Sequence, residues 1–266
     1  MVPIKYSIFT KPWPQLSPDQ LGELVSSLGI DGIEFPCRDG FQVEPKNAEK
    51  GLPLLAERLR EHGVAIMSVA SELTEQVFAG CQAANIPLLR IMARFDRKSR
   101  YMESEAAMKK SLEAFSSMSE KYGVMIGVQH HHGSGVFNSM ELRHLLEGLD
   151  KRYFGAIWDA AHSALSGESA AKGLDIVWDY LCLVNFKSAY FRRKNGPEAL
   201  QASFTPYFTT SANGNTSWEE AVEYLRSRDY RGNVCFPAEY TDQGNMMDYL
   251  PGDIAAAKAL FEKHYR

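Results

Sequence analysis

Long apolar runs, cysteine pairs and blocks of like charge are all missing from this sequence of 266 residues. No stretch approaches the roughly 20 apolar residues that a membrane-spanning helix needs, and the opening MVPIKYSIFTKPW is too polar for a signal sequence. The four cysteines lie far apart without a C-x-x-C pair, which is typical of buried thiols in a reducing compartment rather than of a structural zinc site. We therefore expect a cytoplasmic protein with no membrane partner.

Basic charge is too sparse for a nucleic-acid partner. The formal net charge of -4 is spread along the chain, and no basic face that would neutralise phosphates is visible. No G-x-G-x-x-G follows the first expected strand, which argues against a dinucleotide cofactor. With 45% hydrophobic and 23% charged residues, the composition is that of an ordinary globular protein that can build a sizeable core.

What the sequence does contain is a regular alternation of short apolar runs with amphipathic segments of helical period, typical of βα units around a parallel sheet. Eight such units predict an α/β fold, a single (β/α)8 TIM barrel spanning residues 1–266, because an open doubly wound sheet more often stops at five or six strands. The longest irregular stretch is expected at 189–216. The expected strands, each followed by a helix, are 4–9, 30–35, 64–70, 87–93, 124–131, 155–161, 182–188 and 233–239.

Polar side chains at the ends of these strands are the first candidates for a functional site. In a barrel the site lies at the C-terminal ends of the strands, where residues from distant parts of the chain meet. Few polar side chains are stable in a core without a partner or a ligand. The strand ends carry Glu34, Arg90, Gln129, His131, Asp159, Asn185, Lys187 and Glu239.

Three consecutive histidines follow the fifth expected strand, in the segment IGVQHHHGSG. Successive side chains of a strand point to opposite faces, so Gln129 and His131 share one face while His130 and His132 take the other. The run therefore does not act as one three-histidine site if the strand stays regular. We predict that His131 is a site residue; the alternative is a hydrogen-bonded histidine beneath a loop.

Two acidic residues end apolar strands, Asp159 after AIW and Glu239 in VCFPAEY. A buried carboxylate is costly unless it meets a cation or several donors, so metal ligation is the simplest explanation. The alternative for Asp159 is a cap that accepts backbone N–H bonds from its loop. His162 follows three residues after Asp159 and is a candidate to contact substrate.

Lys187 and a group of basic residues follow the seventh expected strand, in VNFKSAYFRR. Lys187 has the same strand parity as Asn185. Arg192 could attract a carboxylate or phosphate on a substrate, and a solvated run of charge is the alternative.

At this point the segments LGIDGIEFP, KYGVMIGVQHH, GAIWDAAHSALSGE, NFKSAY and DYRGNVCFPAEY resemble the xylose isomerase-like TIM barrels, the sugar phosphate isomerases and epimerases. The resemblance covers nearly the whole chain and implies one divalent ion held by a ligand from each of strands five to eight. The aligned positions are Gln129, Asp159, Asn185 and Glu239. The family commonly has Glu and His where this chain has Gln129 and Asn185. Oxygen donors shift the expected preference from Zn²⁺ toward Mg²⁺ or Mn²⁺.

The resemblance implies an isomerase or epimerase that acts on a small sugar, sugar acid or related hydroxy-carbonyl compound by proton transfer beside a carbonyl. Glu239 is the expected base, with His131 or Lys187 as the second proton carrier. Alternatively, His131 is a ligand that supplies the missing nitrogen to the ion. Expected substrate contacts are Glu34, Arg90, His162 and Arg192.

Three points stay open at this level. The loss of two usual ligands is compatible with a non-catalytic sugar-binding barrel whose metal site has decayed. The sequence does not separate isomerisation and epimerisation from a lyase or dehydratase step, and it is compatible with a homo-oligomer. An abasic-site endonuclease is disfavoured, because the many ligands of a three-zinc centre and a basic surface are both missing.

Overall fold

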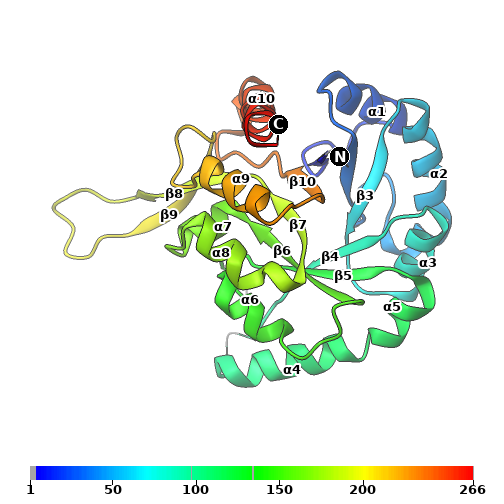
Figure 1. The fold of residues 1–266 in the computed structure, drawn as a ribbon, viewed down its shortest axis with the longest axis horizontal. Coiled ribbons are helices and arrows are strands. Elements are labelled where there is room, and N and C mark those ends of the chain that lie inside the picture. The colour runs from blue at the N-terminus through cyan, green and yellow to red at the C-terminus, as the bar shows by residue number, and fades with distance from the viewer. Residues whose placement is uncertain (1–3, 97, 134, 266) are drawn as a thin grey trace.

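Eight parallel strands close into a barrel in the computed structural model, which describes residues 4–96, 98–133 and 135–265 (Figure 1). The order around the barrel is β1-β10-β7-β6-β5-β4-β3-β2, so the first and last barrel strands pair and leave no open edge. The strands are β1 (Lys5–Phe9), β2 (Gly32–Pro36), β3 (Ala65–Ala70), β4 (Leu88–Met92), β5 (Met125–Gln129), β6 (Phe154–Asp159), β7 (Leu181–Asn185) and β10 (Asn233–Phe236). The TIM barrel predicted from the alternation is confirmed.

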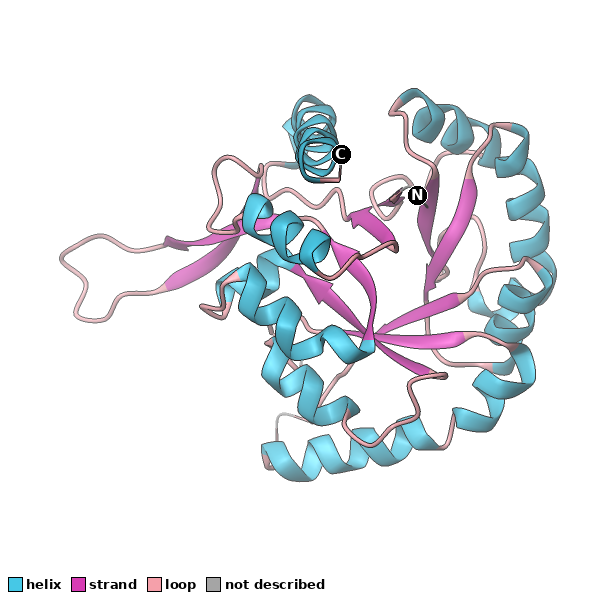
Figure 2. Cartoon of the chain, viewed as in Figure 1, coloured by secondary structure: helices cyan, strands magenta, loops and turns pink. Residues whose placement is uncertain are grey.

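Helices surround this barrel and cover the outer face of its strands (Figure 2). They are α1 (Pro18–Ser27), α2 (Ala48–Glu61), α3 (Glu75–Ala83), α4 (Tyr101–Glu113), α5 (Ser116–Tyr122), α6 (Ser139–Leu146), α7 (Ala160–Leu165), α8 (Ala170–Val177), α9 (Trp218–Ser227) and α10 (Met246–His264). The sequence marks the start of α1 directly, because Ser17 and Gln20 exchange side-chain and backbone hydrogen bonds at 2.9 and 3.2 Å. Such a capping residue contributes about 1 kcal/mol. Among the described residues, no helix is long and apolar enough to cross a membrane.

Two layers of buried side chains hold the barrel in shape. The larger core lies between the strands and the helices and includes Phe35, Trp158 and Phe236. Strand side chains of the opposite parity point into the barrel and fill it, as expected for a small barrel of this size. This inner cluster consists of Phe9, Ala70, Leu88, Ile157, Leu183 and Cys235. The filled interior leaves the C-terminal mouth as the place where polar side chains collect.

Several predicted strands end earlier than expected, and the polar residues just beyond them lie in loops. The clearest case is β10, which stops at Phe236 although the sequence indicated a strand to Glu239. Pro237 has no N–H for the ladder, and Ala238 has a φ of 53°, in the left-handed region. This turn, unusual for alanine, lifts Glu239 over the mouth of the barrel.

The prediction of an irregular stretch at 189–216 was wrong for two segments, 189–193 and 204–209. Strands β8 (Ser188–Arg193) and β9 (Phe204–Thr209) form an antiparallel hairpin that projects from the barrel (Figure 1). The two strands pair only with each other, so they lack the buried apolar run by which barrel strands were recognised. Their stability draws on cross-strand aromatic contacts such as Tyr190 with Tyr207, whose ring centroids are 5.2 Å apart.

Candidate active site

The barrel mouth contains a narrow pocket lined by polar side chains from six of the eight barrel strands or the loops that follow them. Glu34 comes from β2, Arg90 and Met92 from β4, and Asn185 from β7. These side chains meet because parallel strands in a barrel all end at the same rim. The complete lining is Phe9, Lys11, Glu34, Arg38, Arg90, Met92, Gln129, His131, Asn185, Pro237 and Glu239.

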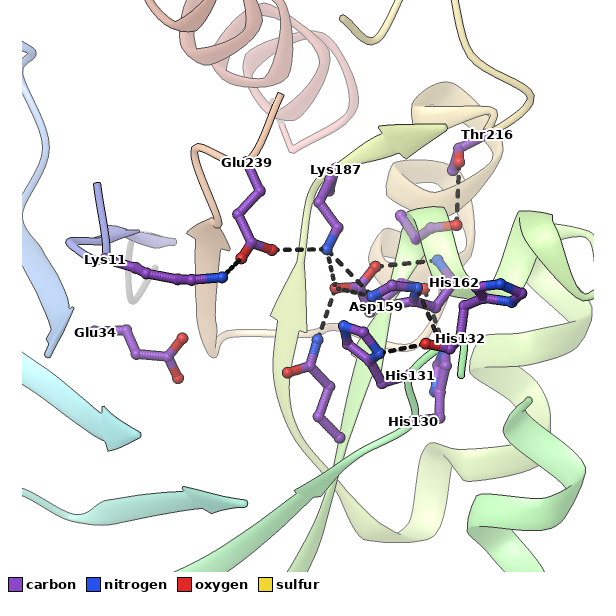
Figure 3. Close-up of polar contacts among 12 residues, drawn as sticks. Lys11, Glu34, His130, His131, His132, Asp159, His162, Lys187, Thr216 and Glu239 are labelled. Atoms are coloured by element: carbon purple, nitrogen blue, oxygen red, sulfur yellow. Dashed lines mark hydrogen bonds and ion pairs between the residues drawn. The ribbon is translucent and has the colours of Figure 1, made fainter. Parts of the chain in front are cut away.

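A buried ammonium group lies between two of the acidic residues of the site, Asp159 and Glu239. Lys187 Nζ is 3.5 Å from Asp159 Oδ2 and 3.2 Å from Glu239 Oε2 (Figure 3). Burial alone would lower the pKa of Lys187, but the charges of Asp159 and Glu239 outweigh it and raise that pKa above its ordinary value. Lys187 is therefore a cation at neutral pH, and it is the positive charge that holds the two carboxylates together.

Glu239 has a second cationic partner on its other oxygen. Lys11 Nζ is 2.6 Å from Glu239 Oε1 (Figure 3). Burial would raise the pKa of Glu239, but Lys187 and Lys11 outweigh it and lower that pKa to about 2. A carboxylate with so low a pKa is a weak proton acceptor, which bears on its predicted role as the base.

A chain of hydrogen bonds runs from Asp159 across the mouth to Glu34. Gln129 Nε2 donates to Asp159 Oδ2 at 2.8 Å, and Arg90 Nη1 donates to Gln129 Oε1 at 2.6 Å. Arg90 Nε in turn donates to Glu34 Oε1 at 2.7 Å, and Ser68 donates to the same oxygen at 3.2 Å. Arginine has no acceptor atom, so it fixes the orientation of the Gln129 amide. The oxygen of Gln129 faces Arg90, and its N–H group faces Asp159.

The three consecutive histidines lie beyond β5, which ends at Gln129, so strand alternation does not decide where they point. His130 is fully buried and donates from Nε2 to the backbone oxygen of Asp159 at 3.1 Å. His132 lines a neighbouring pocket with Phe95 and Tyr101, and His131 borders that pocket as well. His131 shares the central pocket with Gln129.

The hydrogen bond of His131 determines its tautomer. Its Nδ1 lies 2.7 Å from the backbone oxygen of His132 (Figure 3). A carbonyl oxygen only accepts, so Nδ1 carries the hydrogen and Nε2 of the neutral ring keeps a free lone pair. Burial and the charge of Lys187 lower the pKa of His131 below its ordinary value. The site thus contains a neutral imidazole with an unprotonated nitrogen at the pocket.

His162 is buried beside this group and is held neutral. Its Nε2 is 3.2 Å from Lys187 Nζ, and its Nδ1 is 3.3 Å from the backbone N–H of His132. A neutral imidazole has one unprotonated nitrogen and accepts from one of these two donors, whereas an imidazolium could accept from neither. Burial, followed by the charge of Lys187, lowers the pKa of His162 well below its ordinary value. The ring lies beside His131, with centroids 4.0 Å apart and planes tilted by 47°, and it does not line the central pocket, so it supports the site from behind.

The structure brings together all but one of the predicted site residues. Glu34, Arg90, Gln129, His131, Asp159, His162, Asn185, Lys187 and Glu239 lie in or directly behind the mouth. The exception is Arg192, which is exposed on β8 with its guanidinium 5.3 Å from the centre of the Tyr207 ring. Because the hairpin carries it away from the pocket, its solvated-charge interpretation fits and a direct substrate contact does not.

Sequence reasoning missed two cations of the pocket, Lys11 and Arg38. Each follows two residues after the end of its strand, β1 and β2, as Lys187 does after β7. That common spacing was the available signal. The guanidinium of Arg38 is half-buried at the pocket, and it lies 5.8 Å from the centre of the Phe9 ring.

The four residues predicted to hold a divalent ion do not present a free set of donor atoms. Both oxygens of Asp159 accept hydrogen bonds, from Gln129 and from the backbone N–H of His162 at 3.1 Å, so its predicted capping role is also present. Both oxygens of Glu239 face ammonium groups. Gln129 points its N–H group, and not its oxygen, toward Asp159. Of the four, Asn185 keeps a free oxygen, since its buried Oδ1 has no partner among the described residues. As folded, these four residues do not fit a divalent ion.

Comparison with known proteins gives the relationships of this barrel. An inosose dehydratase from Bacillus velezensis is 25% identical over 249 residues, which are 82% of this chain and 81% of that protein. The structure of a D-psicose 3-epimerase with D-tagatose from Clostridium cellulolyticum has a TM-score of 0.72 and 13% identity, covering 98% of this chain and 99% of that chain. The structure of the IOLI protein with a zinc atom has a TM-score of 0.74 and 15% identity, covering 98% and 99%. Residues 23–260 match the model of one family over most of the chain, so this protein belongs to the xylose isomerase-like TIM barrel family.

Proposed function

We propose that this protein is a sugar-modifying enzyme that removes a proton beside the carbonyl group of a small polyhydroxylated ketone or aldehyde. The observation that carries the proposal is the hydrogen bond from His131 Nδ1 to the His132 carbonyl, which leaves Nε2 as a proton acceptor at the pocket. A correctly positioned base of this kind contributes roughly 10²- to 10⁴-fold to the rate. The relationship to an inosose dehydratase supports a substrate of the sugar type.

In this scheme, His131 replaces Glu239 as the base. Glu239 has two ammonium partners and a pKa of about 2, so it accepts a proton poorly. Its role is to hold Lys11 and Lys187 at the mouth. Removal of the proton places negative charge on the carbonyl oxygen, and a cation at the pocket stabilises that charge. Lys11 lines the pocket and supplies this cation, and Lys187 lies behind Glu239.

The number of proton carriers bears on how the reaction ends. Two-face epimerisation needs a second carrier on the opposite side of the substrate, and the amide of Gln129 cannot take a proton. Isomerisation needs only one base that returns the proton to the neighbouring carbon. Dehydration needs one base and an acid that protonates the departing hydroxyl, a role open to Lys11. We therefore favour dehydration or one-base isomerisation over epimerisation, and the inosose dehydratase relative favours dehydration of the two.

The proposed function is tested by incubating the protein in D₂O with inosose, D-psicose, D-fructose and D-tagatose. Enolisation gives deuterium at the carbon beside the carbonyl, measured by NMR. Dehydration also gives a conjugated product that absorbs in the ultraviolet, whereas isomerisation gives a new sugar without that absorbance. A ligand that raises the apparent Tm but exchanges no proton would instead favour the non-catalytic sugar-binding barrel.

Activity should fall on the acid side of the pH profile. The base must be neutral to accept a proton, and burial with the nearby Lys187 lowers the pKa of His131 below the ordinary 6.5. We expect kcat/KM to be level near pH 7 and to decrease only as the pH falls through a value below 6.5. A profile that still rises between pH 7 and 8 would contradict His131 as the base.

A further inference from the structure

We propose that the Lys187 ammonium group takes the position of the divalent ion in this barrel, and that the protein works without a resident metal. Lys187 Nζ lies between Asp159 and Glu239, two of the positions from which the family resemblance implies metal ligands. Whether the site holds a metal ion can be measured independently of the proposed reaction.

The ammonium of Lys187 already has close partners. An ammonium has three N–H donors. Two carboxylate oxygens accept from it within 3.5 Å, Asp159 Oδ2 and Glu239 Oε2, and the ring nitrogen His162 Nε2 lies 3.2 Å away. The Phe208 ring covers it from the hairpin side, with its centre 4.7 Å from Nζ. An incoming ion would have to displace a buried cation that has no better partner to move to.

The charges at this site are already balanced without a metal ion. Asp159 and Glu239 carry two negative charges, and Lys187 and Lys11 already balance them. A divalent ion added to this group would leave two unbalanced positive charges beside two ammonium groups. At separations of 3–4 Å in a poorly solvated site, such repulsion opposes binding strongly.

The neutral side chains of the site are oriented unfavourably for a metal ion. Arg90 donates to Gln129 Oε1 at 2.6 Å, which forces the amide N–H group toward the space beside Asp159. An N–H group repels a metal ion. Asn185 alone offers a free oxygen there, and one neutral oxygen is far from the six or so that Mg²⁺ or Mn²⁺ prefers.

Metal content and thermal stability test this inference directly. The full-length protein is purified without chelator, its metals are measured by mass spectrometry, and its apparent Tm is recorded with EDTA, Mg²⁺, Mn²⁺ or Zn²⁺. We expect a substoichiometric metal content and an apparent Tm that none of the additions raises. One equivalent of tightly bound metal, or a rise in Tm with Mn²⁺, would overturn the inference whatever the catalytic activity is.

One exposed cluster away from the mouth needs a control. Glu219, Glu223 and His264 have ligand atoms within 4.8 Å of one another, and stray metal could bind there. The measurements are therefore repeated on Glu223→Gln. Metal that persists at one equivalent in this variant counts against the inference.

Removing the ammonium should create the ion site that the wild type lacks. In Lys187→Met the carboxylates of Asp159 and Glu239 lose the cation between them, so Mn²⁺ should raise the apparent Tm by several degrees where the wild type does not respond. The matched control is Lys11→Met, which keeps Lys187 in place and should not respond. A folded Lys187→Met protein that ignores Mn²⁺ would contradict the inference. If that variant does not fold, the wild-type measurements decide.

Discussion

His131→Gln should reduce proton exchange and turnover by roughly 10²- to 10⁴-fold, the usual contribution of a positioned general base. The glutamine amide can keep the hydrogen bond to the His132 carbonyl, which His131 Nδ1 makes at 2.7 Å. It has no group that accepts a proton at neutral pH. The loss should appear in kcat rather than in KM, because the base acts on the reacting carbon and binds the ground state little. Initial rates and deuterium incorporation measured on the same preparation check this.

His132→Gln is the matched control, since it makes the same chemical change one residue along the chain. His132 lines the neighbouring pocket with Phe95 and Tyr101 and does not line the central one. Its backbone carbonyl, which orients His131, is unchanged by the substitution. We expect the rate to change by less than about tenfold, as is usual for residues outside the reacting centre. Equal losses from the two substitutions would mean that the histidine run is structural.

Much of this architecture follows from patterns that are local in the sequence. Alternating apolar runs and helical periodicity predict the barrel because every βα unit has an apolar strand and an apolar helix face that must be buried. Strand parity does not extend to His131 and its two neighbours, because β5 ends at Gln129. The hairpin β8–β9 was not predicted from the sequence, because its strands bury no continuous apolar face and pair only with each other.

The pairing of charges, in contrast, depends on distances that no sequence pattern encodes. The sequence argument requires something positive between Asp159 and Glu239, and a metal ion is the usual answer. In the folded chain the positive group is Lys187, which meets Asp159 from 28 residues away and Glu239 from 52. A lysine ammonium group and a metal ion can each supply the positive charge that two neighbouring buried carboxylates require. Only the position of Nζ distinguishes them.

Lys187→Met should destabilise the protein by about 3–5 kcal/mol, the usual result of removing one partner from a buried ion pair. Methionine keeps an unbranched apolar stem, so the loss reports chiefly on the uncompensated charges of Asp159 and Glu239. Chemical denaturation at pH 7 gives the free energy of unfolding. Lys11→Met is the control, because its side chain is 48% exposed and a pair at the surface contributes only about 0–1 kcal/mol.

The pH dependence of this difference separates lost charge from lost packing. The pKa of Glu239 is lowered from 4.5 to about 2 in the folded wild type, so its pairing stabilises the protein above pH 4.5, and that stability is lost as the pH falls toward 2. In Lys187→Met the buried carboxylates lack this cation, and their protonation at acid pH relieves the repulsion. The gap between the two proteins should therefore narrow as the pH falls from 4.5 toward 2. A gap that stays constant over this range would assign the loss to packing, and the ammonium would then not be what holds the two carboxylates together.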